Sequence, residues 1–162
     1  MNPRNPVPVR RGFTLIEVLI TLTILGILAS ALMPLLELDA RRNREDELRH
    51  GLRELRVAID AYKHAADTGD IAKPADSTGY PPSLDVLAAG VPLLNSPNGA
   101  RVYFIRRLPR DPFAAGDVPA AATWGTRSYA SPPDAPSTGD DVFDVHSLAP
   151  GDGLNGVPYK QW

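Results

Sequence analysis

The chain contains an apolar run, residues 13–36, in which Glu17 is the only formally charged side chain. A helix rises about 1.5 Å per residue, so this run would extend about 36 Å, more than the roughly 30 Å hydrocarbon core of a bilayer. We therefore predict a membrane-spanning helix. A charged side chain near the centre of a bilayer costs roughly 2.5–3.5 kcal/mol, which makes Glu17 a functional candidate that needs a partner.

A short basic segment, residues 1–12, precedes the run. It contains three arginines (Arg4, Arg10 and Arg11), three prolines and no acid, which is typical of a leader outside the membrane. In a secretory signal the cleavage site follows a shorter apolar run, whereas here the small residue Gly12 precedes it. Arginines also follow the run, but long domains translocate largely regardless of charge. We expect the leader to lie in the cytoplasm.

Charge and cysteine content exclude several classes of function. The net charge is −2, and removal of the three leader arginines makes it −2 − 3 = −5, which argues against a nucleic-acid binder. The chain has no cysteine, which excludes disulfides, thiolate metal sites and a cysteine nucleophile.

A second pattern follows the apolar run. Leucine, isoleucine and tyrosine recur at helical spacing, which predicts an amphipathic helix with the apolar stripe Leu48, Leu52, Leu55, Ile59 and Tyr62. We place the charged residues on the opposite faces: Arg44, Glu45, Glu47, Arg49, Arg53, Glu54 and Asp60. The stripe either packs on its own domain, the alternative that we favour, or forms an intermolecular coiled coil.

A single helix would join the two patterns, from Phe13 to about Ala66, with Gly69 near its end. Its weak points should be Gly26 and Pro34. Glycine costs about 1 kcal/mol relative to alanine in a helix interior, and proline removes the hydrogen bond to residue i−4.

Proline and glycine become frequent from residue 68 onward, which indicates a small domain with long loops. We predict one short helix at residues 83–89 and strands at residues 102–108, 126–130 and 142–147. About three short antiparallel strands would form a sheet packed on the amphipathic helix, an α+β fold.

The residues offer little support for catalysis. Asp144, His146 and Ser147 are the nearest approach to a triad, but alternation along a strand places Ser147 on the face opposite the other two. The sequence contains no glycine-rich phosphate loop or zinc-ligand spacing. We predict no enzymatic activity; a signal-anchored periplasmic enzyme or binding module remains the alternative of another class.

Oxygen ligands near the C-terminus make calcium the one metal to consider. They are Asp140, Asp141, Asp144, Asp152 and Asn155. These residue types are also the usual ones in turns, and we favour that interpretation.

Residues 12–20, GFTLIEVLI, resemble the leader junction and N-terminal helix of type IV pilins and type II secretion pseudopilins. Within this superfamily the chain is most similar to the major, G-type pseudopilin. The segments that carry this similarity are YP at 80–81, VYFIRRLPRDPF at 102–113 and DVHSL at 144–148.

The resemblance implies a pilin-like fold whose long N-terminal helix, membrane-spanning in its first half, packs on a small antiparallel sheet domain. It divides the chain into a cleaved leader (1–12), a transmembrane and filament-core helix (13–38), an amphipathic continuation (39–67) and a periplasmic globular domain (68–162).

By the same resemblance, prepilin peptidase would cut between Gly12 and Phe13 and methylate the new amine of Phe13. Glu17 would pair with the terminal amine of an adjacent subunit during assembly. The alternatives are that Glu17 pairs within its own chain or is protonated in the membrane.

The implied function is that of a structural subunit of the type II secretion pseudopilus. It would polymerise from the inner membrane with itself and other pseudopilins, driven by a platform protein and a secretion ATPase, and push proteins through an outer-membrane secretin. A type IV pilin or minor pilin used for adhesion, motility or DNA uptake is the alternative.

The similarity breaks down at residues 151–159, GDGLNGVPY, which lack the closely spaced later acids of the family's calcium loop. We therefore expect no cofactor and no metal, and expect Tyr159 and Trp162 to close this loop by packing. If calcium did bind, its ligands would be Ser147, Asp152 and Asn155.

Overall fold

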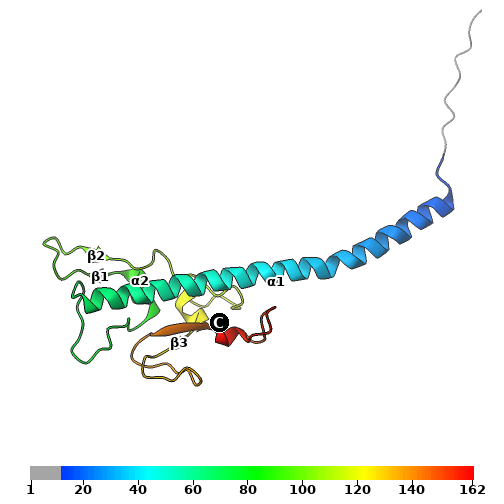
Figure 1. Cartoon of the computed structure of the whole chain (residues 1–162). Coiled ribbons are helices and arrows are strands. Elements are labelled where there is room, and N and C mark those ends of the chain that lie inside the picture. The colour runs from blue at the N-terminus through cyan, green and yellow to red at the C-terminus, as the bar shows by residue number, and fades with distance from the viewer. Residues whose placement is uncertain (1–11) are drawn as a thin grey trace, which may run out of the picture. The chain divides into compact units, whose positions relative to one another are not determined.

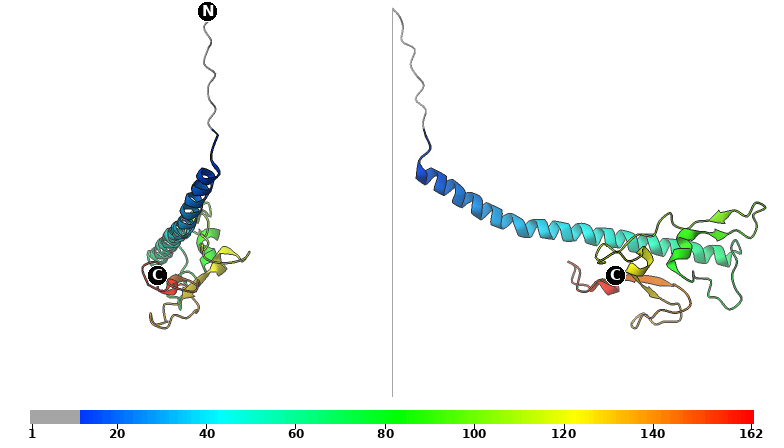
Figure 2. Two further views of the ribbon diagram at one scale, coloured as in Figure 1. Left: turned by 90° about the vertical axis from the view of Figure 1, so that its right-hand side faces the viewer. Right: turned by 180° about the vertical axis from the view of Figure 1, so that it is seen from behind.

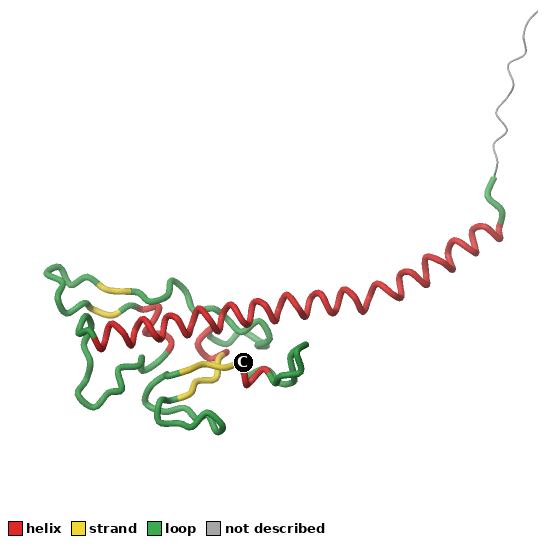
Figure 3. The backbone as a smooth tube through the Cα atoms, in the orientation of Figure 1, coloured by secondary structure: helices red, strands yellow, loops and turns green. Residues whose placement is uncertain are grey.

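The computed structural model describes residues 12–162, and it gives only the backbone of residues 31–34. All of the predicted leader except Gly12 therefore lies outside the described residues. Helices and strands both occur, which confirms the α+β class (Figures 1 and 3). The elements are α1 (Leu15–Asp67), α2 (Leu84–Ala89), β1 (Val91–Pro92), β2 (Arg101–Val102), η1 (Ala120–Thr123), β3 (Trp124–Arg127), β4 (Asp144–Ser147) and η2 (Tyr159–Gln161).

The chain divides into two compact units, with the boundary between Arg41 and Arg42. Helix α1 contributes residues to both. In the first unit every described side chain from residue 12 to residue 30 is exposed. In the second unit the same helix carries the hydrophobic core.

The apolar stripe of α1 is buried, as predicted. Leu48, Leu52, Leu55, Ile59 and Tyr62 are all at most 8% exposed. They pack with apolar residues from the loops, α2, β3, β4 and η2: Ile71, Leu84, Leu87, Ile105, Trp124, Val145 and Tyr159. The stripe therefore packs on its own domain.

Helix α1 ends where the sequence predicts. The N–H groups of Thr68 and Asp70 donate to the carbonyls of His64 and Ala65, and Gly69 between them has a φ of +77°. A residue without Cβ adopts this left-handed conformation at little cost, so glycine terminates the helix.

One prediction about α1 is wrong. Glu45 is not on the charged face: it is 2% exposed and belongs to the buried interior. It lies three residues before Leu48, and therefore one turn earlier along the same stripe.

The strands form two separate antiparallel pairs in the described part of the chain, where we predicted one sheet of about three strands. Strand β1 pairs with β2, and β3 pairs with β4 in the register Trp124↔Ser147 to Arg127↔Asp144. Figure 1 shows the β1–β2 pair and α2 beside the C-terminal end of α1, and the view from behind in Figure 2 agrees.

The predicted strand 102–108 is wrong in extent, because strand structure stops at Val102. The N–H groups of Phe104 and Ile105 both donate to the carbonyl of Leu87 in α2. Because these two N–H groups bind a carbonyl at the end of a helix, they cannot pair with a neighbouring strand. The other two strands are also displaced, to Trp124–Arg127 and Asp144–Ser147.

We predict that Leu55→Ala lowers the free energy of unfolding by about 2–5 kcal/mol, because Leu55 is fully buried and the truncation leaves a cavity. Urea unfolding of the detergent-solubilised chain, followed by the fluorescence of the buried Trp124, measures this change. Val57→Ala is the matched control, since Val57 lies on the same helix and is 68% exposed. Equal losses in the two variants would contradict the core assignment.

Candidate functional site

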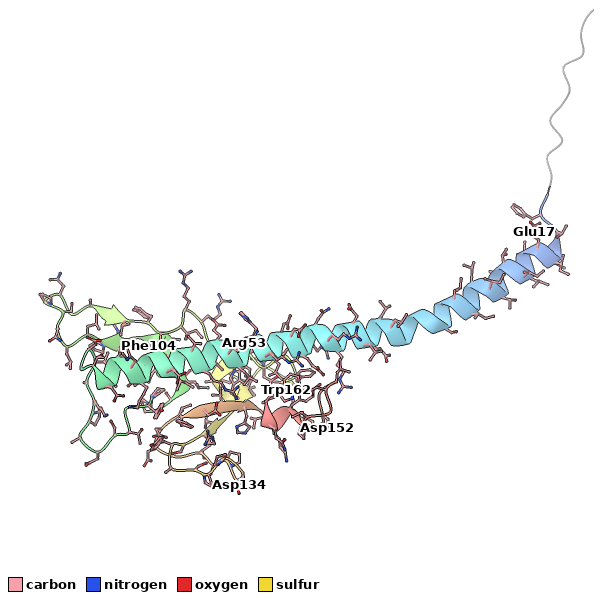
Figure 4. The ribbon with its side chains drawn as sticks, in the orientation of Figure 1. Glu17, Arg53, Phe104, Asp134, Asp152 and Trp162 are labelled. Carbon is pink, nitrogen blue, oxygen red and sulfur yellow. The ribbon has the colours of Figure 1, made fainter. Side chains whose placement is uncertain are left out.

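The candidate site is the start of α1. The N–H of Glu17 donates to Oγ1 of Thr14 at 3.3 Å, and the N–H of Val18 donates to the carbonyl of Thr14 at 3.2 Å. Thr14 is therefore the N-cap, and Glu17 is the third residue of the helix. A threonine cap with a glutamate three residues later is the residue pattern of a capping box, and among the described residues only its threonine half is formed. Figure 4 shows Glu17 at this end of α1.

The carboxylate of Glu17 forms no hydrogen bond or ion pair with any residue that the structure describes. It lies in the first turn of α1, where the helix dipole stabilises a negative charge by about 0.3–1 kcal/mol. This offsets part of the cost of a charge in a bilayer, which is roughly 2.5–3.5 kcal/mol at the centre and smaller toward the interface. The local helix start therefore reduces the cost of Glu17 without removing it.

The other polar side chains of the apolar run are satisfied within the helix. The hydroxyls of Thr21, Thr23 and Ser30 donate to the carbonyls of Val18, Leu19 and Ile27, respectively, at 2.7–2.9 Å. A hydroxyl with an internal acceptor enters lipid without an unsatisfied donor. By length and composition, α1 is also sufficient to cross a membrane.

Gly12 and Phe13 precede α1 in irregular, exposed backbone, and the side chain of Phe13 is 82% exposed. The bond between them is thus outside the helix. Helix α1 continues through Gly26 and Pro34. Their role as weak points stays a prediction.

The triad-like residues of β4 are separated as predicted. Ser147 is buried and donates to Asp111, whereas Asp144 and His146 lie on the other, partly exposed face. Asp144 forms ion pairs with Arg56 at 2.8 Å and with Arg127 at 3.5 Å. Asp144 and Ser147 are therefore engaged in contacts within the fold.

Burial lowers the pKa of the His146 imidazole, against a weaker opposing effect of Asp144. Below the pKa of a free histidine, about 6.5, the unfolded chain therefore binds a proton at this position that the folded chain does not. The resulting loss of stability begins as pH falls through that value and is absent above it.

We predict that the free energy of unfolding decreases less between pH 7 and pH 5 in His146→Gln than in the unmodified chain, because the glutamine does not titrate. Denaturant unfolding at several pH values measures how the free energy of unfolding changes with pH. His50→Gln, at an exposed position on α1, is the control. Identical slopes in the His146 variant and the unmodified chain would exclude this linkage.

Two of the acids considered for calcium, Asp141 and Asp144, have other partners. Asp141 accepts hydrogen bonds from the hydroxyls of Thr78 and Ser128 and from the N–H of Tyr129. Burial alone would raise the pKa of Asp141, but these hydrogen bonds lower it overall. Asp141 therefore organises its loop, in agreement with the turn interpretation.

Comparisons with known proteins agree with this arrangement. Residues 8–33 match the prokaryotic N-terminal methylation motif. The type II secretion system core protein G of Dickeya chrysanthemi is 30% identical over 156 residues, covering 91% of this chain and 95% of its own. Core protein G of Klebsiella pneumoniae is 33% identical over 110 residues, covering 65% and 71%. That of Pectobacterium carotovorum is 30% identical over 152 residues, covering 91% and 80%. No solved structure matches the chain significantly.

The long apolar helix, the small strand-containing domain and the methylation motif define a member of the type IV pilin superfamily. Within that superfamily the similarity extends over nearly the whole chain. The chain belongs to the type II secretion system core protein G family, the major pseudopilins. This is a family of structural subunits, not of enzymes.

Proposed function

We propose that the chain is stored as a single-pass protein of the bacterial inner membrane and is assembled into a periplasmic pseudopilus. The observation that carries this proposal is the combination of an exposed helix of membrane-spanning length with Glu17 in its first turn. Its C-terminal domain would lie in the periplasm. Membership of the core protein G family supports the secretion role over that of an adhesive or motility pilus.

Processing would act on the bond between Gly12 and Phe13. Prepilin peptidase is an aspartic protease at the cytoplasmic face of the membrane, and a residue without a side chain before the cut avoids a clash in its active site. The cut releases the amine of Phe13, which is then methylated. The match of residues 8–33 to the methylation motif and the irregular backbone at Gly12 support this site.

The new amine would supply the partner of Glu17. Once Phe13 is the first residue, its positive charge lies only four positions before the carboxylate. Pairing with the amine of an adjacent subunit would offset the desolvation of both charges and set the axial register between subunits. Pairing within one chain and protonation in the membrane are the competing outcomes.

Assembly would exchange lipid contacts of α1 for contacts with neighbouring helices. Lipid tails are as apolar as leucine side chains, so the hydrophobic gain is small, and packing together with charge pairing must direct assembly. The energy would come from a secretion ATPase acting through an inner-membrane platform protein. The growing pseudopilus, which includes other pseudopilins, would push folded proteins through an outer-membrane secretin.

We predict that the mature protein extracted from membranes begins with N-methylated Phe13. Intact-mass and N-terminal peptide mass spectrometry measure the terminus and its methyl group. Deletion of the prepilin peptidase gene is the control and should leave Met1 in place. An intact Met1 terminus in wild-type cells, or cleavage after Ala31, would contradict the assigned site.

We predict that Glu17→Gln leaves membrane insertion intact and abolishes crosslinking between subunits, because glutamine is similar in size and keeps the main-chain bond to Thr14 but carries no charge. Disulfide crosslinking between cysteines introduced into the apolar helix measures assembly, since the chain has no native cysteine. Glu37→Gln, at an exposed acid of the same helix, is the matched control. Normal crosslinking in Glu17→Gln would eliminate the charge-pairing proposal.

A further inference from the structure

Glu45 of α1 binds the loop at the far end of the sequence, residues 148–162, which we name the C-terminal loop. Its Oε1 accepts a hydrogen bond from the N–H of Leu154 at 2.8 Å and another from the hydroxyl of Tyr159 at 2.9 Å. Both carboxylate and hydroxyl are buried. Hydrogen bonds to a charged acceptor are about twice as strong as neutral ones, so this contact is a strong link between helix and loop.

Two arginines of α1 extend the same attachment. Arg49 lies 3.6 Å from Oε2 of Glu45, and its guanidinium stacks 4.4 Å from the ring centroid of Trp162. Arg56 donates to the main-chain oxygen of Trp162 at 2.7 Å and to the carboxylate of Asp144 at 2.8 Å. Figure 4 shows Trp162 lying against α1.

Aromatic packing closes the loop, as the sequence predicts. The ring of Tyr159 lies 5.2 Å from that of Trp162 and 4.6 Å from that of Phe113, measured between centroids. Gly153 lies under Trp162, where an added Cβ would be 2.2 Å from the indole ring. Only glycine fits at this close approach.

The oxygen atoms of this region do not fit a calcium ion, although the family resemblance implies one. Oγ of Ser147 is engaged with Asp111, and Oδ1 of Asn155 accepts the N–H of Val157. No group of three or more histidine, aspartate or glutamate side chains that could hold a metal occurs in the described part of the chain. Arg49 and Arg56 add positive charge beside the loop, which opposes a cation.

We infer that the buried carboxylate of Glu45 fastens the C-terminal loop in place of a calcium ion, so that the periplasmic domain folds independently of calcium. A divalent cation joins a loop by collecting several oxygens around one charge. Here the fixed charge belongs to the protein and is negative, and the loop supplies donors, the N–H of Leu154 and the hydroxyl of Tyr159. A calcium ion would bind acceptor oxygens of the loop, whereas the Glu45 carboxylate binds donor groups of the loop.

The experiment uses the full processed chain in detergent. Thermal unfolding is measured in excess calcium chloride and in excess EGTA, and chymotrypsin cleavage within the C-terminal loop is followed by intact-mass spectrometry. For the unmodified chain we expect the same Tm and the same slow cleavage in both solutions. A Tm raised by calcium or lowered by EGTA would overturn the inference.

Variants at Glu45 test the carboxylate itself. Glu45→Ala should lower Tm by at least about 5 °C and accelerate loop cleavage, because it leaves buried donors without an acceptor. Glu45→Gln retains an acceptor oxygen and should lie between Glu45→Ala and the unmodified chain. Glu47→Ala, at an exposed acid of the same helix, is the matched control. Loop cleavage in Glu45→Gln no faster than in Glu47→Ala would overturn the role of Glu45, even if Glu45→Ala does not fold.

Discussion

Burial of the apolar stripe of α1 is the interaction on which the rest of the second unit depends. The strands contain two to four residues each and form two separate pairs, and two-stranded pairs are marginally stable alone in water. They are ordered because Leu48, Leu55 and Ile59 provide one continuous surface against which loops, α2 and β4 pack. Helix α1 therefore forms one side of the hydrophobic core, and the irregular segments pack against it.

The same helix carries two carboxylates in opposite environments. Glu17 lies in an exposed, apolar first turn and has no partner among the described residues of its own chain. Glu45 is buried and accepts two hydrogen bonds from the C-terminal loop. An unpartnered charge in an apolar region favours association with another molecule, whereas a fully satisfied buried charge stabilises one tertiary arrangement. This difference is the reason that we propose an assembly contact for Glu17 and a folding contact for Glu45.

Attachment of the C-terminal loop through a protein carboxylate makes the stability of the domain independent of metal concentration. A loop held by a metal depends on the concentration of that metal, because binding stabilises the folded state by mass action. A loop held by Glu45, Arg49 and Arg56 depends only on covalently connected groups. Ion pairs with partly exposed arginines contribute little individually, so the buried carboxylate and the aromatic packing of Tyr159 and Trp162 carry most of the attachment.

The processing junction at Gly12 and Phe13 and the role of Glu17 stay predictions. Sequence alone determined the membrane-length helix, the buried stripe and the helix end near Gly69. These features depend on local composition and on periodicity, which are readable within a few turns of helix. It also separated Asp144 and His146 from Ser147, because alternation in a strand is local.

Tertiary structure alone decided the extent of the strands and the placement of Glu45. The N–H groups of Phe104 and Ile105 bind a carbonyl of α2, and the carboxylate of Glu45 meets donors more than one hundred residues away along the chain. Glu45 stands in register with the stripe, three residues before Leu48, but a carboxylate there is buried only because the distant loop supplies its hydrogen bonds.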